Sequence, residues 1–159
     1  MSLFKKLFGS NKPKGFMDEF WGSLEYESKT DIYGKKQFSK NPKGQIKFYN
    51  MDVKIDLECG KNGTNQEQKA FFIQINNEFP KIISEKLIPI LNSELAKWLD
   101  VPSHQVNFDN DFILNELFLP MCLNFPVKWK MVLYYPKIDQ FMTVHFVDFE
   151  PQTKIQFES

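Results

Sequence analysis

Arginine is absent from this chain. All 20 basic residues among its 159 are lysine, and 20 aspartate and glutamate residues bring the formal net charge to zero. Without arginine the protein has no bidentate guanidinium clamp for phosphate or carboxylate, and it lacks the commonest specific contact of proteins with guanine. We therefore expect no nucleic-acid partner, and we interpret the lysine- and aromatic-rich stretch 35–49 as a solvated hairpin. Abundant Lys, Asn, Ile and Phe are also typical of AT-rich coding, which explains missing arginine without any functional cause.

Cysteine and histidine are scarce. Cys59 and Cys122 form no C-x-x-C motif, and His104 and His145 are far apart in the sequence. A metal site needs several such ligands at close spacing, so we expect no metal and no cofactor. No phosphate-binding glycine loop and no G-x-S-x-G elbow is present. We predict a non-enzymatic protein with free thiols, leaving open one disulfide and a catalytic pairing of a histidine with Cys122 or a carboxylate.

Long apolar runs are missing as well. A membrane-spanning helix needs ~18 or more consecutive apolar residues, and a secretory signal needs an apolar region of ~7–15 residues before its cleavage site. The sequence offers neither, so we expect a cytoplasmic protein without stable membrane insertion. Residues 1–15 place Leu3, Phe4, Leu7 and Phe8 among lysines. This pattern indicates either a short amphipathic helix at a membrane or partner, or a frayed terminal turn.

Phenylalanine, by contrast, is plentiful, and the first third of the chain has the period of β-strands. The chain holds 17 Phe within 42% hydrophobic residues, enough for a core. Residues 51–59 alternate strictly between apolar and polar side chains, which predicts a strand with one buried face. The apolar parity changes at Tyr49-Asn50, which predicts a tight hairpin turn. We expect further strands over 20–28 and around 36–38.

A helical stripe of apolar residues follows over 66–99. Pro80 and Pro89 interrupt it, which predicts two or three helical pieces, and Thr64 or Asn65 is the expected N-cap. Strands return from Gln105 onward, with 112–119 either a strand or a turn and 141–149 a central strand.

This order of elements predicts an α+β fold, with an antiparallel sheet of five to seven strands packed against helices from residues 66–99. We expect one domain over 16–159, preceded by a basic tail over 1–15. The residues expected in the core are Phe48, Val53, Ile55, Leu57, Phe72, Ile75, Ile83, Leu87, Leu91, Val144 and Phe146.

Charge is distributed unevenly along the chain. Residues 28–47 hold six lysines and one acid, whereas no lysine stands between Lys97 and Lys128. Acidic residues in this second stretch favour an acidic face that binds another protein, such as a basic toxin domain. The residues expected to form this partner-binding face are Asp100, Asp109, Asp111 and Glu116.

Three motifs resemble a group of small bacterial proteins of unknown function. Trp21-Gly22 stands where that group has a W-G strand, and Val53, Ile55 and Leu57 match its amphipathic hairpin. Gln68, Phe72 and Ile75 match its helix, which opens with glutamine. The resemblance covers about residues 1–92, and some members are implied to be immunity-type proteins encoded beside bacterial toxins. It carries over no catalytic residue.

Two function hypotheses follow. The first is a non-enzymatic protein-interaction domain, for example an immunity-type protein that neutralises a bacterial toxin. The alternative is a small-molecule or lipid-binding domain whose pocket on the sheet is lined by the aromatic residues Trp129, Tyr134, Tyr135 and Phe141.

Overall fold

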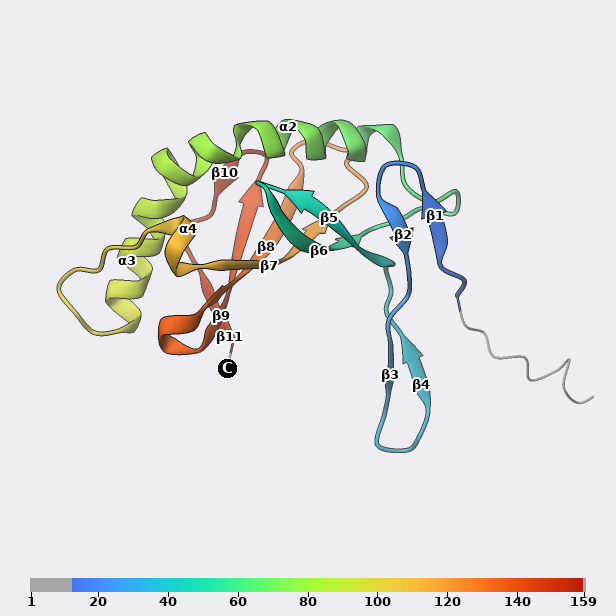
Figure 1. Ribbon diagram of the computed structural model, residues 1–159, viewed down its shortest axis with the longest axis horizontal. Helices are drawn as coiled ribbons and strands as arrows, with labels where there is room; N and C mark the ends of the chain where they lie inside the picture. The colour runs from blue at the N-terminus through green and yellow to red at the C-terminus, as the bar shows by residue number, and fades with distance from the viewer. Residues whose placement is uncertain (1–12, 159) are drawn as a thin grey trace, which may run out of the picture.

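The computed structural model describes residues 13–158 (Figure 1). The first twelve residues of the expected tail 1–15 therefore lie outside the described range. The strands are β1 (Phe16–Asp18), β2 (Gly22–Leu24), β3 (Ser28–Thr30), β4 (Lys36–Phe38), β5 (Lys43–Phe48), β6 (Met51–Leu57), β7 (Ile113–Leu119), β8 (Lys128–Tyr135), β9 (Gln140–Val147), β10 (Glu150–Pro151) and β11 (Gln156–Glu158). The helices are α2 (Gln66–Ile82), the π-helical turn η1 (Ile83–Leu87), α3 (Ile88–Trp98), the four-residue α4 (Phe108–Asp111) and the 3₁₀ turn η2 (Pro136–Ile138).

A seven-stranded sheet forms the centre of the molecule and confirms the predicted α+β class. Its order is β10-β9-β8-β7-β6-β5, and β11 also pairs with β9. One pairing corrects the expectation of an antiparallel sheet, because β6 and β7 run parallel. The chain leaves β6, passes through the helices and re-enters the sheet beside β6, and such a crossover produces parallel neighbours.

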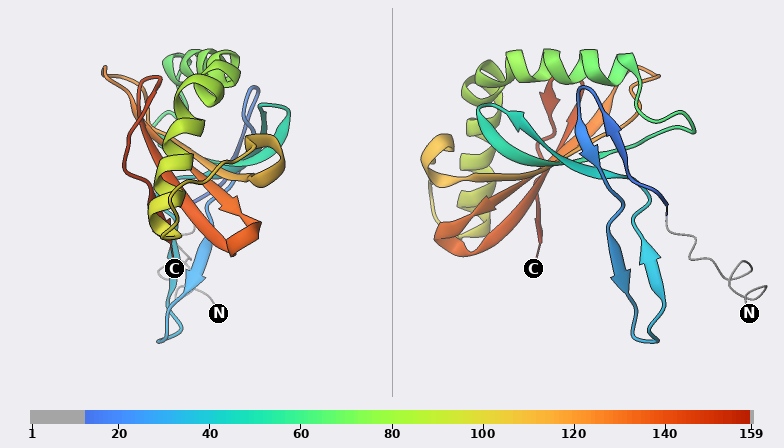
Figure 2. Two further views of the ribbon diagram at one scale, coloured as in Figure 1. Left: turned by 90° about the vertical axis from the view of Figure 1, so that its left-hand side faces the viewer. Right: turned by 45° about the vertical axis from the view of Figure 1, so that its right-hand side comes forward.

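Helices α2 and α3 cover one face of this sheet (Figures 1 and 2). All eleven residues expected in the core are buried there. Phenylalanines join the layers: Phe48 of β5 lies 4.6 Å from Phe79 of α2 between ring centroids. At the far end, Trp98 of α3 stacks on Phe157 of β11 at 5.2 Å. Burial of this apolar surface is the main source of the fold's stability.

The β5–β6 hairpin confirms the turn predicted at Tyr49-Asn50. Both residues have positive φ angles, 50° and 62°, and Phe48 pairs with Met51 across the turn. Two consecutive positive φ values are the signature of a two-residue hairpin turn whose twist matches the flanking strands.

The helical region bends at its prolines, as predicted. Pro80 lies in the last turn of α2, and the chain then widens into the π-helical turn η1 before α3 begins. Pro89 follows this π-helical turn directly and stands in the first turn of α3. Figure 1 shows α3 turned steeply away from α2, which lets the pair wrap around the sheet.

Gln68 fastens the start of α2 to the sheet. Asn65, one of the two expected caps, accepts a hydrogen bond from the Gln68 N–H at 2.7 Å. The fully buried Gln68 side chain donates from Nε2 to the carbonyls of Glu58, Leu119 and Pro120. These carbonyls follow or end the parallel strands β6 and β7, so one side chain holds both strand ends.

The strand expected over 20–28 is confirmed only at Gly22–Leu24, which forms β2, and is wrong as one continuous strand. Asp18 Oδ1 accepts hydrogen bonds from the N–H groups of Phe20 and Trp21, which folds the chain into a β1–β2 hairpin. Burial alone would raise the pKa of Asp18, but hydrogen bonds from Thr64 and these backbone amides lower it to about 2. Gly22 continues the turn with a φ of 74°. The alternation of apolar residues thus spans a turn and two separate strands.

A second hairpin projects from the body of the molecule. It comprises residues 28–40, here called the arm, and its strands β3 and β4 form a separate two-stranded sheet. Both Figure 1 and Figure 2 show the arm pointing away from the seven-stranded sheet. The expected short strand near 36–38 is confirmed as β4.

Candidate functional site

The face of the sheet opposite α2 and α3 has no helix over it in the described part of the chain (Figure 2). Strand alternation turns every second side chain to this open face. Register places Asp56, Phe118, Lys130 and His145 in one row across β6, β7, β8 and β9. The open face is therefore polar and aromatic, whereas the covered face is almost wholly apolar.

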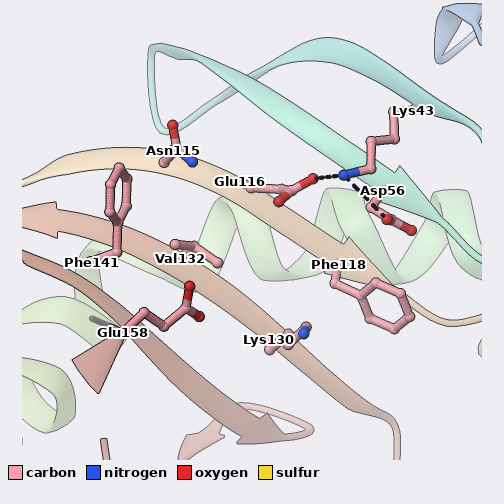
Figure 3. A pocket seen from close by; sticks show the side chains of 9 residues that line it. All are labelled: Lys43, Asp56, Asn115, Glu116, Phe118, Lys130, Val132, Phe141 and Glu158. Atoms are coloured by element: carbon pink, nitrogen blue, oxygen red, sulfur yellow. Dashed lines mark hydrogen bonds and ion pairs between the residues drawn. The ribbon is translucent and has the colours of Figure 1, made fainter. Parts of the chain in front are cut away.

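A hollow of about 540 Å³ lies on this open face (Figure 3). Three carboxylates and two lysines line it, together with aromatic and aliphatic side chains. The lining residues are Lys43, Asp56, Asn115, Glu116, Phe118, Lys130, Val132, Phe141 and Glu158. The excess of one carboxylate makes the hollow mildly acidic.

Lys43 lies at the centre of a cluster of charged side chains at one side of the hollow, called the Lys43 cluster below. Its Nζ lies 2.7 Å from Glu116 Oε1, 3.4 Å from Glu27 Oε2 and 3.7 Å from Asp56 Oδ2. Lys54 approaches Glu27 at 3.1 Å, and Asn41 donates to Asp56 at 2.8 Å. Figure 3 shows Lys43 and Glu116 reaching toward each other from separate strands.

The surroundings shift the pKa values of these groups in different directions. Burial would lower the pKa of Lys43, but its bond to Glu116 and the charges of Glu27 and Asp56 raise it overall. Burial raises the pKa of Asp56. The hydrogen bond from Lys54 lowers the pKa of Glu27. When all are ionised, the hollow and the cluster beside it bring four carboxylates, Glu158 included, against three lysines, Lys130 included, which leaves one negative charge available for a cation.

A second hollow of about 510 Å³ adjoins the first, because Phe118 and Lys130 line both. Its other lining residues include Trp129, His145 and Val147. Lys130 Nζ lies 5.5 Å from the Phe118 ring centroid, a cation–π contact between the two hollows. Together they form a trough with a charged end and an apolar end, called the trough below.

The four acids of the predicted partner-binding face do not share one environment. Asp100 and Asp109 are exposed near the end of α3 and in α4. Asp111 is buried and pairs with Lys137 at 2.7 Å, which lowers its pKa. Glu116 lies on β7 inside the trough. The structure thus brings Glu116 to the candidate site and leaves the other three at the α4 end of the molecule.

Lys43, Asp56 and Glu27 were missed as site residues. Asp56 stood on the polar side of the clearest strand, where a charge indicates solvent. Lys43 and Glu27 stood at the two ends of a lysine-rich polar stretch. These residues could be identified only by their pairing with side chains that are distant in the sequence. Lys43 and Glu116, for example, are 73 positions apart.

The histidines and cysteines make contacts of a structural kind. His104 Nε2 lies 3.1 Å from the Tyr135 hydroxyl, and His145 Nε2 lies 3.3 Å from Gln156 Oε1. Both cysteines are free thiols, and burial raises the pKa of each to about 11. A thiol with so high a pKa is a poor nucleophile at neutral pH.

The four aromatic residues that the ligand-binding hypothesis placed in one pocket lie in different environments. Trp129 and Tyr135 are buried, and Trp129 donates from Nε1 to the Asp148 carbonyl at 2.7 Å. Tyr134 and Phe141 lie side by side with ring centroids 4.8 Å apart, and Phe141 lines the trough.

Two features are absent from the part of the chain that the structure describes. Within residues 13–158 no group of three or more His, Cys, Asp or Glu side chains is arranged to hold a metal ion. No helix in that range has the length and apolarity needed to cross a bilayer.

Comparisons of the chain with protein-family models, curated proteins and solved structures found no match. The resemblance to immunity-type proteins therefore stays a prediction that rests on the sequence motifs.

Proposed function

We propose that this chain is a non-enzymatic protein-interaction domain that receives a basic segment of a partner protein in the trough. The observation that carries the proposal is the Lys43 cluster, which holds three carboxylates and two lysines on an uncovered sheet face. A lysine or arginine from a partner would complete its charge balance.

The chemistry of the trough supports a protein segment as occupant. One end offers carboxylates for a cation, and the other end offers apolar surface from Phe118 and Val147. Charged complementarity mainly sets association rate and specificity, while buried apolar contact supplies affinity. An extended segment with basic and apolar residues would use both ends at once.

The cluster is also held in place before binding. Lys43, Asp56 and Glu116 come from three neighbouring strands, and their side chains are largely buried, each with about a fifth exposed. Pre-ordered groups lose little side-chain entropy on association.

The partner that we propose is the one predicted from the sequence. We infer that the chain is an immunity-type protein of a bacterial cytoplasm whose partner is a basic toxin domain. Glu116, one of the four predicted partner-binding acids, belongs to the trough, and this supports a basic partner.

The test compares a trough variant with a matched surface variant. Glu158→Lys/Phe141→Ser changes the trough, and Glu78→Lys/Ile73→Ser makes the same exchanges on the exposed side of α2. Each is used for purification from the native host and for protection against toxins of neighbouring genes. We expect the wild type and the α2 variant to retain one basic partner and to protect, and the trough variant to lose both.

Two results would contradict the proposal. One is the absence of both a specific partner and protection with the wild type. The other is equal partner binding by the trough variant.

The ligand-binding alternative has one observation in its favour, the apolar lining of the second hollow. Its volume lies within the range of ~300–1,000 Å³ typical of small-molecule sites. Titration with a short fatty acid, monitored by NMR of Val147 and His145, discriminates the two. Saturable shifts confined to these residues, without any protein partner, would favour the alternative.

A further inference from the structure

The arm ends in two exposed apolar side chains. Ile32 is 91% exposed and Tyr33 is 88% exposed at the tip. Such exposure is unusual for a pair of large apolar neighbours, and contiguous exposed apolar surface commonly marks an interaction site.

The tip is nevertheless an ordered turn. Asp31 Oδ1 accepts hydrogen bonds from the N–H groups of Tyr33 and Lys35 at 3.0 and 2.8 Å. Gly34 adopts a φ of 78° and donates its N–H to the Asp31 carbonyl. The two apolar side chains are therefore presented by a defined loop.

Lysines surround this tip. Lys29, Lys35, Lys36 and Lys40 are exposed, and Asp31 is the one acid in residues 28–40. Within residues 13–158 none of these four lysines has a carboxylate within 4.0 Å. The arm thus carries uncompensated positive charge, unlike the trough.

The charged and apolar residues are arranged by depth. Lys35 lies in the turn beside the tip, and Lys29 and Lys36 lie on the strands three residues behind Ile32 and Tyr33, at most roughly 10 Å away at the rise of a strand. Apolar groups of peripheral proteins enter a bilayer to a depth of ~5–10 Å, where cationic side chains meet the headgroups. The spacing along the arm matches this depth.

The shape of the tip favours a bilayer over a protein. A stable protein interface buries ~800 Å² on each partner, and a convex tip of two side chains offers only a small part of that. A lipid surface surrounds a convex tip without any need for a matching groove.

We propose that the arm binds the surface of bilayers that contain anionic phospholipids, with Ile32 and Tyr33 entering the interface and the lysines contacting headgroups. This binding is peripheral and reversible, and it does not depend on the function proposed for the trough.

The experiment is co-sedimentation of the full chain with phosphatidylcholine vesicles, with or without phosphatidylserine. We expect binding to the anionic vesicles that weakens with added salt. Lys35→Gln/Lys36→Gln should bind about 25-fold more weakly, since each lysine near an anionic surface contributes roughly fivefold. Ile32→Ser/Tyr33→Ser should bind about tenfold more weakly, since both apolar side chains are lost.

Matched controls lie elsewhere on the surface. Lys61→Gln/Lys81→Gln removes two exposed lysines, and Ile113→Ser removes an exposed apolar side chain. Both should bind as the wild type does. Every changed side chain is exposed, so thermal unfolding should show that all variants fold.

A labelled arm distinguishes lipid from an acidic protein. Ile32→Cys gives one exposed thiol, while Cys122 is buried, Cys59 is half-buried, and burial raises the pKa of both. An environment-sensitive dye at position 32 should shift to the blue with anionic vesicles and remain unchanged with polyglutamate. The reverse response would overturn the proposal in favour of an acidic protein. Equal sedimentation with both vesicle types, or unchanged binding by both arm variants, would also overturn it.

Discussion

The two faces of the seven-stranded sheet are built from alternate residues of the same strands, yet they differ in almost every property. On the covered face, β8 presents Met131 and Leu133, both fully buried. On the open face, the same strand presents Lys130 and Val132, both half-buried. The comparison separates two tasks: burial against α2 and α3 stabilises the fold, and the open face holds the charged cluster around Lys43, where we propose that a partner binds.

The largest difference between the two faces is expected in unfolding free energy, and neighbouring residues of β8 test it. Leu133→Ala opens a cavity on the covered face, and we expect it to lower the free energy of unfolding by about 2–5 kcal/mol. Val132→Ala on the open face should cost about 1 kcal/mol or less. Urea denaturation measures both. Equal losses would show that the open face is packed as tightly as the covered one.

A smaller loss of stability is expected at Gln68, a buried polar residue on the covered side of the sheet. Gln68→Ala removes three hydrogen bonds and takes from the carbonyls of Glu58 and Pro120 the donor that Gln68 supplies, while the Leu119 carbonyl still accepts from Glu58 N–H. We expect a loss of about 2–3 kcal/mol in unfolding free energy. Gln74→Ala, on the exposed side of α2, should cost nothing measurable because alanine is the better helix former. Thermal denaturation of both variants shows whether the loss of stability depends on the buried position of Gln68 or follows the removal of any glutamine from α2.

The open face should respond to pH. Lys43→Met leaves Glu27, Asp56 and Glu116 without their shared cation, and we expect a loss of about 1–2 kcal/mol at neutral pH. The deficit should shrink as pH falls through the acidic range: burial raises the pKa of Asp56, so this carboxyl protonates above its ordinary value of 3.8, whereas the lowered pKa of Glu27 keeps it ionised to below 4.5. It should also shrink at high pH: the raised pKa of Lys43 gives stability that is present below its ordinary value and lost as pH rises through the folded value. Unfolding measured across pH checks the window, and a deficit independent of pH would contradict the ionic explanation.

The smallest effect belongs to an exposed ion pair on the same open face. Lys47 and Asp52 approach to 2.8 Å, but both side chains are about two-thirds or more exposed. Lys47→Met should change stability by less than ~0.5 kcal/mol. If Lys47→Met lowered the free energy of unfolding as much as Lys43→Met does, the cluster around Lys43 would contribute no more to stability than an exposed ion pair.

How much of this could be predicted from sequence depended on the range of the interactions. Alternation over 51–59 predicted β6, and the parity change at Tyr49-Asn50 predicted its hairpin, because both signals are local. The stripe over 66–99 and its prolines likewise predicted bent helices. The strand expected over 20–28 was wrong as one continuous strand because a single side chain, Asp18, folds the chain back within an apolar alternation.

The remaining features depend on contacts between distant residues. No local pattern states that β7 lies parallel to β6, since the pairing is decided by how the helices cross the sheet. The predicted acidic face illustrates the same limit. Asp111 pairs with Lys137 while Glu116 pairs with Lys43, so their separation could not be read from neighbouring positions.

The parallel pairing of β6 with β7 also has a consequence for the order of folding. Hairpins β5–β6 and β8–β9 join residues that are close in sequence, whereas the β6–β7 ladder closes a loop from Leu57 to Ile113. Loop closure costs more entropy as the loop lengthens, and contacts of high sequence separation slow folding. We expect the two sides of the sheet to form first and this single ladder to join them last. Pulsed hydrogen exchange during refolding would show late protection of the amides of Asp56 and Leu117, since Glu58 N–H donates to β7 and alternate residues of β6 share that direction.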